Sequence, residues 1–478
     1  MRKLTFVAFS LAEGAVIIPN LIFVGLIYNH YGNYSYIFPF VLLYAFEKAG
    51  IFSIKGFGEL LNPYPMVKRL MILTFVGSIF MMAGIWSHIL WDIGAILIGV
   101  GLSAYPALFR TIVDIQKELN ISTDQKAVNK AYLFLLVFIA VVISIRHTHY
   151  SLIFLLFFIY ITLVCLYIWK LEIPDSLINQ PIFRKKKNSK KYFTASLLIL
   201  LFALGVRFLK QTANVYFILL VFLVLCIFIF ALNIPQKRSL NKSSLHTLLI
   251  GGIRNYLTIY SLIFFTAIGQ STKVMISYAL ITAGMFISML FTQKLNNVLK
   301  LTEPFKFYPM TTSRSTPASI SGVLRLLRPW ITISNLEAGF KTPSQAKNSV
   351  YLLGSCFGMI LMLIPYCYFI GITVSAFFVT SANKDATHNI ITEENIAAYE
   401  KRLVKARFYG LGAIIQQAVF LIVLLSVSFF LNGKANLALS AYVYLSATPQ
   451  LTTTFHITGL ICTLITVACS LILTKNKP

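Results

Sequence analysis

A few ionisable residues fall inside long apolar runs of this chain, where a charge is costly unless a partner or a polar cavity accepts it. Of only 15 Asp and Glu residues, Glu13 and Glu47 lie within such runs, and Glu47 is followed by Lys48. A carboxylate removed from water holds its proton more readily and can exchange it near neutral pH. We therefore expect Glu13, with Glu47 as a second candidate, to couple protons or contact a substrate. The alternative for Glu13 is a structural ion pair, for example with Arg207, Arg254 or a lysine.

Four further polar residues are candidates for the same kind of site. Arg254 lies about two turns into an apolar run, so it can either contact an anionic substrate or extend its side chain to the inner surface. Asn255 follows it, and Asn20 lies in the first apolar run. Gln416 is the fourth candidate for substrate binding or proton coupling. Because Gln417 is its neighbour and adjacent helical residues point in different directions, at most one of these two amides is expected to face a cavity.

No residue spacing typical of an enzyme or a metal site occurs in the chain. The GxSxG, Walker A and HExxH patterns are absent. His147 and His149 have no carboxylate or cysteine close by in the sequence, so we expect no metal site there. The 6 cysteines lie within apolar runs without CxxC spacing and are interpreted as small hydrophobic residues. We therefore expect neither an enzymatic activity nor a cofactor.

The composition is that of a membrane protein, with 58% hydrophobic and 12% charged residues. Apolar runs of about 18 or more residues recur, and each is long enough to cross a bilayer core of roughly 30 Å. Backbone polar groups in lipid must be satisfied within the segment, which predicts an all-α, polytopic membrane helical bundle. The net charge of +26 does not indicate nucleic-acid binding, because most Lys and Arg residues lie in short loops between the runs.

The alternation of basic and uncharged turns predicts that both termini are cytoplasmic. The weakly apolar segment 318–337, interrupted by Arg325 and Arg328, is counted as a poor span, since otherwise the basic segments 381–406 and 475–477 would lie outside. We thus expect about fourteen spans, within a range of twelve to fourteen. The alternative is thirteen spans, with 318–337 as a re-entrant or amphipathic segment. The clear spans are 4–28, 36–55, 69–88, 90–113, 131–146, 150–170, 193–209, 215–233, 247–268, 275–292, 350–380, 407–431 and 453–474.

These spans divide into two six-helix halves with an extra hairpin between them. We expect an N-terminal bundle at 1–182 and a basic cytoplasmic linker at 183–192. The extra two-helix hairpin follows at 193–246, and the C-terminal bundle occupies 247–478. The basic loops face the cytoplasm, which places the chain in the cell membrane as a multi-pass protein.

Two segments within about the first 115 residues carry a family signature. The turn after the second span reads Gly-Glu-Leu-Leu-Asn-Pro-Tyr from Gly58 to Tyr64 and is followed by Lys68 and Arg69. The fourth span contains Gly-Val-Gly and ends in Tyr-Pro-Ala-Leu at 105–108. These features resemble the major facilitator superfamily and, with the 6+2+6 arrangement, its fourteen-span branch. The resemblance implies a gating loop that includes Gly58, Asn62, Lys68 and Arg69.

The resemblance also implies a secondary active transporter, which moves a small solute across the plasma membrane by alternating access between its two halves. Because the chain has no ATP-binding motif, an ion gradient or the gradient of the substrate would drive transport. One alternative is a flippase for lipid-linked saccharides, and another is a non-transporting membrane scaffold or sensor. A polar cavity lined by Glu13 and Arg254 favours the transporter, a wide cationic cavity open to lipid the flippase, and a closed bundle the scaffold. The expected partners are therefore a small-molecule or lipid-linked substrate and the lipid bilayer, with the oligomeric state left open.

Overall fold

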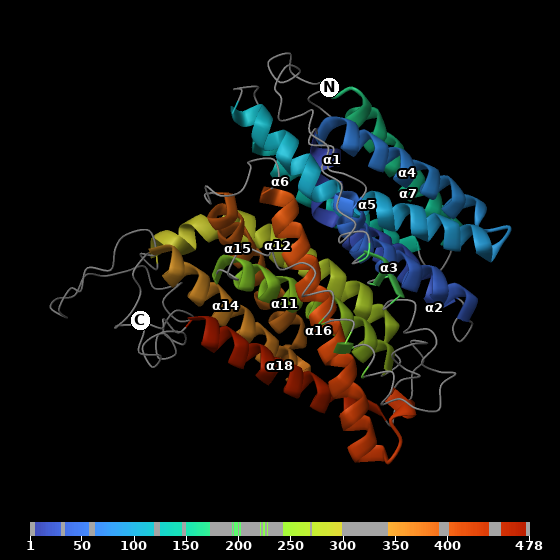
Figure 1. Ribbon diagram of the computed structural model, residues 1–478. Helices are drawn as coiled ribbons and strands as arrows, with labels where there is room; N and C mark the ends of the chain where they lie inside the picture. Colours follow the sequence, from blue (N-terminus) through green and yellow to red (C-terminus); the bar gives the residue numbers. More distant parts are fainter. Residues whose placement is uncertain are drawn as a thin grey trace.

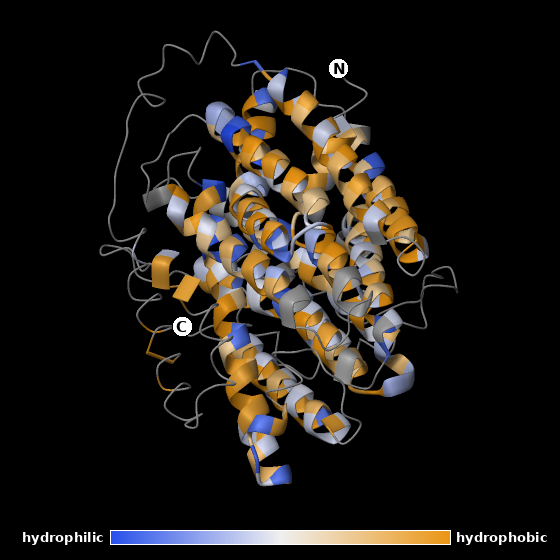
Figure 2. Ribbon diagram, turned by 90° about the vertical axis from the view of Figure 1, so that its right-hand side faces the viewer, coloured by the Kyte–Doolittle hydropathy of each residue, from blue (hydrophilic) through white to orange (hydrophobic). Residues whose placement is uncertain are grey.

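The computed structural model of the chain is a bundle of helices, and all regular structure in its described residues is helical. The helices form two groups that lie side by side (Figure 1). Hydrophobic residues cover most of the helix length, with many hydrophilic residues near the ends (Figure 2). The chain therefore has the predicted fold class, a polytopic membrane helical bundle. The described residues are 5–29, 34–56, 63–118, 125–145, 150–172, 194, 196–198, 200–201, 220, 223–224, 227, 242–267, 270–298, 343–391, 401–438 and 451–474.

The described part of the chain contains 9 helices long and apolar enough to cross a membrane, or up to 10 if one bent pair is counted as a single span. The first group consists of α1 (Thr5–Gly14), α2 (Ile17–Asn29), α3 (Tyr34–Gly56), α4 (Pro63–Ala83), α5 (His88–Glu118), α6 (Gln125–Ile145) and α7 (Tyr150–Trp169). The second consists of α11 (Lys242–Ala267), α12 (Ser271–Val298), α14 (Pro343–Met362), the short 3₁₀ helix η5 (Pro365–Cys367), α15 (Tyr368–Ile391), α16 (Lys401–Asn432) and α18 (Thr452–Thr474).

The first predicted span, 4–28, is a bent pair rather than one straight helix. The axes of α1 and α2 differ by 68°. Pro19 explains the break, because it offers no N–H to the carbonyl of Ala15 and its ring clashes with that carbonyl. The break leaves Glu13 near the end of α1, where its side chain reaches α5 and α6.

The third span begins earlier than predicted. We expected a span at 69–88, whereas α4 starts at Pro63 and ends at Ala83. Proline is favoured at the first helical position, since the N–H that it lacks would have no partner there. Lys68 and Arg69 therefore belong to the first turns of α4 and not to the loop before it.

The predicted single span 350–380 is wrong, because the structure has two antiparallel helices there. After α14, Pro365 opens η5, and Cys367 N–H donates to the carbonyl of Ile364 at 2.9 Å, which closes the turn before α15. Glycines let the two helices pack closely: a Cβ on Gly358 would lie 2.5 Å from the backbone nitrogen of Ser375. The composition stays apolar through the turn, so hydrophobicity alone does not indicate a break between two helices. Pro365 was the only residue that indicated it.

This hairpin removes the reason for counting 318–337 as a span. It supplies, within the described residues, the reversal of chain direction for which 318–337 had been counted as a span. The segment 318–337 itself lies outside the described residues, as does most of the predicted hairpin at 193–246. The total of fourteen spans therefore stays a prediction, while the described helices after 242 already bring 401–405 back to the side where α11 begins.

The two groups repeat the same pattern of helix contacts. In the first, α5 packs against α3 and α4, α1 against α6, and α4 against α7. In the second, α15 packs in the same way against α12 and α14, α11 against α16, and α14 against α18. Across the groups, α6 contacts α12, and α16 contacts both α3 and α5. Within the described residues, the fold thus consists of two helical halves with a similar pattern of contacts and an interface between them.

Candidate functional site

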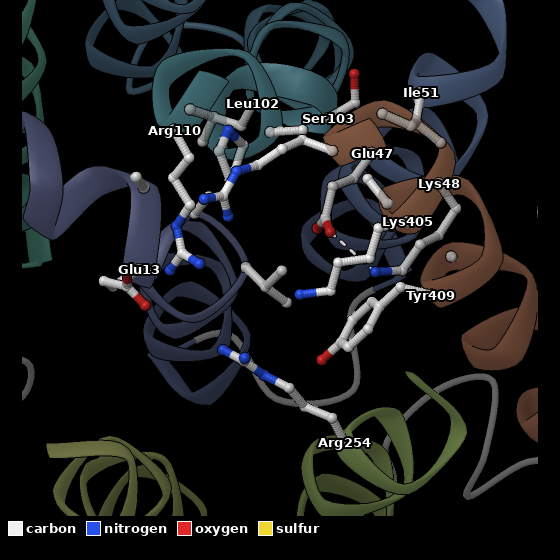
Figure 3. Close-up of a pocket in the computed structure, with 18 of the residues that line it drawn as sticks. Glu13, Glu47, Lys48, Ile51, Leu102, Ser103, Arg110, Arg254, Lys405 and Tyr409 are labelled. Carbon is white, nitrogen blue, oxygen red and sulfur yellow. Dashed lines mark hydrogen bonds and ion pairs between the residues drawn. The ribbon is translucent and has the colours of Figure 1, made fainter. Parts of the chain in front are cut away.

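A charged cavity of about 170 Å³ lies at the interface between the halves. Helices α1, α3 and α5 of the first half and α11, α15 and α16 of the second contribute its walls. Figure 3 shows several of its charged side chains extending into one shared space. The lining residues are Ala12, Glu13, Ala15, Val16, Glu47, Lys48, Ile51, Leu102, Ser103, Pro106, Ala107, Arg110, Arg254, Asn383, Arg402, Lys405, Ala406, Tyr409 and Gly410.

Glu13 is held by a cation and a phenol of its own half. Arg110 of α5 forms an ion pair with one carboxylate oxygen, and the Tyr132 hydroxyl of α6 donates to the other at 2.5 Å. The Glu13 side chain is only 9% exposed. We had named Arg207, Arg254 or a lysine as possible partners, and sequence reasoning missed Arg110. Its position inside the predicted span 90–113 was the available signal, because an intramembrane arginine needs a partner as much as a carboxylate does.

Glu47 and Lys48 form the second ion pair on the wall of the cavity. The Lys48 ammonium lies 2.9 Å from the Glu47 carboxylate, and both residues are buried. The same ammonium is 5.3 Å from the centre of the Tyr44 ring, in a cation–π contact. Neighbouring residues of one helix thus neutralise each other within α3.

A third ion pair joins the two halves at one end of the cavity. Arg402, near the start of α16, donates from Nε to the carboxylate of Asp114, near the end of α5, at 2.7 Å. Its Nη2 is 2.6 Å from the same carboxylate oxygen. Asp114 does not line the cavity itself. Since α5 and α16 belong to different halves, the pair holds these helix ends together across the interface.

Arg254 and Lys405 also line the cavity, and in the described structure both donate hydrogen bonds to neutral groups. Arg254 donates to the sulfur of Met285 at 3.4 Å. Lys405 donates to the carbonyl of Asn383 at 3.2 Å and to the Thr387 hydroxyl, and it is 9% exposed. Neither cation forms an ion pair in the described structure, so the two give the cavity a positive character. Burying a charge without an opposite charge costs free energy.

The predicted amide residues do not line this cavity. The Asn255 amide donates to Gln416 Oε1 at 2.6 Å and to the carbonyl of Ala413 at 3.1 Å, and its oxygen accepts from the Tyr44 hydroxyl at 3.2 Å. This network connects α3, α11 and α16 across the interface. Asn20 is buried in α2, where its side-chain oxygen has no hydrogen-bond partner.

Of the predicted gating residues, Lys68 and Arg69 are described, and neither lines the cavity. Lys68 lies over the Trp169 ring of α7, 5.9 Å from its centre, and Arg69 is exposed. Gly58 and Asn62 lie outside the described residues, as do His147 and His149. Within the described part of the chain, no group of three or more His, Cys, Asp or Glu side chains could hold a metal ion.

Comparisons with known proteins give a structural likeness only. No protein-family model matches the chain, and no curated protein sequence does. The crystal structure of an auto-inhibited POT family peptide transporter is similar over 100% of this chain and 96% of its own, with 13% identity and a TM-score of 0.55. The POT family transporter PepTSo is similar over 99% and 97%, with 11% identity and a TM-score of 0.55. The POT family is part of the major facilitator superfamily, so the chain has a major-facilitator-like fold.

Proposed function

We propose that this protein is a secondary active transporter that moves a small solute across the cell membrane by alternating access. The observation that carries the proposal is the charged cavity between two similar helical halves, lined by both Glu13 and Arg254. A non-transporting scaffold would have no use for such a cavity, since each buried charge in it costs stability. The likeness to POT peptide transporters supports the proposal and makes peptides one class of solute to test.

In the proposed cycle, one half rocks against the other around the cavity. The ion pair between Asp114 and Arg402 closes one end of it, where α5 ends and α16 begins. With both termini in the cytoplasm, as the basic loops predict, this is the cytoplasmic end. Opening toward the cytoplasm requires these helix ends to separate, and the pair opposes that step. Glu13 is our candidate for proton coupling, because it lies on the cavity wall within reach of Arg110.

A labelling experiment tests this cycle without knowledge of the solute. A cysteine introduced by Ala406→Cys, at a position that lines the cavity, would be placed in a variant without native cysteines. We expect Asp114→Asn to raise its rate of reaction with a thiol reagent added to inside-out vesicles several-fold. The pair is partly exposed, so the change in conformational free energy is about 1 kcal/mol.

The charge-swapped variant, Asp114→Arg with Arg402→Asp, is the matched control and should restore slow labelling. Uptake of radiolabelled dipeptides, nucleosides and organic acids into proteoliposomes under a pH gradient completes the test. Equal labelling rates in all variants, together with no uptake above that of empty liposomes, would refute a transporter.

A further inference from the structure

Three of the five basic residues that line the cavity are already neutralised. Lys48 pairs with Glu47, Arg110 with Glu13, and Arg402 with Asp114. In the described structure, this uses both carboxylates on the cavity wall. The two remaining basic residues donate to a thioether, a hydroxyl and a carbonyl. When Asp114 is counted with these two carboxylates, two positive charges of the cavity still have no carboxylate among the described residues that balances them.

We propose that the substrate of this cavity is a small soluble anion, bound by Arg254 and Lys405. This deepens the proposed function, since it names the class of solute that the transporter would carry. Arg254 of α11 offers a planar fork of N–H donors, suited to a carboxylate or a phosphate, and Lys405 of α16 adds a compact charge. The two helices pack directly against each other, so both cations belong to one wall. In Figure 3, both side chains and Tyr409 extend into the same space.

The size and the polarity of the cavity further restrict the class of substrate that it can bind. A volume of about 170 Å³ corresponds to roughly six water molecules of bulk liquid, enough for a small organic acid or phosphate ester. A zwitterion such as a dipeptide would bring an ammonium group that needs an acceptor. Both lining carboxylates are engaged in ion pairs, so that ammonium would have to break one of them. An anion without an amine is thus favoured over a peptide.

Binding to the purified full-length protein in phosphatidylcholine nanodiscs tests the proposal. The probes are succinate, inorganic phosphate and 3-phosphoglycerate, with uncharged succinamide as the size-matched control for succinate. We expect at least one of the anions to raise the thermal unfolding midpoint in a concentration-dependent manner, as a ligand of the folded state does, and succinamide to leave it unchanged. Absence of any effect from all three anions would overturn the proposal.

Variants locate the effect in the cavity. Arg254→Gln and Lys405→Gln should each weaken anion binding by about tenfold or more, since each removes a charge-assisted hydrogen bond. Lys294→Gln is the matched control: it removes the same charge from an exposed position in the same half and should bind normally. Without ligand, neither cavity variant should unfold at a lower temperature, because a costly unpaired charge is lost. Arg254→Lys keeps the charge and should bind more weakly than the native protein but better than Arg254→Gln.

The outcomes separate this inference from the proposed function. Anion binding that depends on Arg254, without uptake into proteoliposomes, would refute transport and leave the anion site. Uptake of a dipeptide or nucleoside that the three anions do not inhibit would refute the anion site and leave transport. If only nanodiscs containing phosphatidylglycerol stabilise the protein through Arg254, a lipid phosphate is the ligand, and the soluble anion is wrong.

Discussion

At the scale of single residues, the net charge of the cavity depends on which of its charged side chains form ion pairs. Glu13 was expected to be either functional or part of a structural ion pair. The structure shows that it pairs with Arg110 and lines the cavity, and its role in proton coupling or substrate binding stays a prediction. Arg254 was expected to contact an anion or to extend to the membrane surface. Its guanidinium points into the cavity instead of to the surface (Figure 3).

Replacing Glu13 by glutamine should destabilise the protein by about 3 kcal/mol, because it leaves the Arg110 charge without its partner. Chemical denaturation of the purified protein measures this. The double variant Glu13→Gln with Arg110→Met should regain most of the loss, since the unpaired charge is then gone. Losses that simply add in the double variant would contradict the pairing. Unchanged pH dependence of uptake in Glu13→Gln would exclude proton coupling at this residue.

At the scale of elements, close contact between α11 and α16 positions the two unpaired cations. A Cβ on Gly412 would lie 1.8 Å from the carbonyl oxygen of Leu248, and one on Gly251 would lie 2.1 Å from that of Tyr409. Only glycine allows the two backbones to approach this closely. The contact brings Lys405 and Arg254 to the same wall of the cavity.

Gly412→Ala should therefore lower the free energy of unfolding by about 1–3 kcal/mol, because the added methyl group pushes α16 away from α11. The matched control is Gly410→Ala in the same helix. Its Cβ would meet only Ile51 at 3.9 Å, an ordinary contact, so we expect no loss of stability. Denaturation of both variants in the same detergent compares them. Equal losses of unfolding free energy in the two variants would show that the contact between α11 and α16 leaves room for a methyl group at Gly412.

At the scale of the whole molecule, the turn at Pro365 determines how the second half crosses the membrane. With α14 and α15 as separate helices, this turn lies at the end of the bundle opposite to the start of α16. Tyr366, in the turn, is 97% exposed. If the basic loops face the cytoplasm, the turn faces outside.

A cysteine in place of Tyr366 should react with a membrane-impermeant maleimide added to intact cells. Lys434→Cys, in the exposed turn after α16, should react as well, and Lys170→Cys, at the end of α7, should not. All three would be made in a background without native cysteines. Labelling of Lys434→Cys but not of Tyr366→Cys, with proper expression of both, would contradict the α14–α15 hairpin.

Much of the fold could be predicted from local properties of the sequence. The length of an apolar run and the charge of the loop after it are local, and a bilayer acts on them directly, so the sequence predicted a helical membrane bundle and most of its helices. The errors fell where a proline interrupts continuous apolar sequence: Pro19 bends the first span, and Pro365 splits a predicted one into two.

That Glu13 and Arg254 would need a partner or a polar cavity follows from the apolar runs alone, because an ion inside a bilayer is costly wherever the helix points. Which partners and which cavity they have depends on how the helices pack. Arg110 is far from Glu13 in the sequence, and Lys405 is far from Arg254, so their proximity depends on how the helices rotate and pack. Rotation and packing follow from close contacts such as that of Gly412 with Leu248, which no single segment contains.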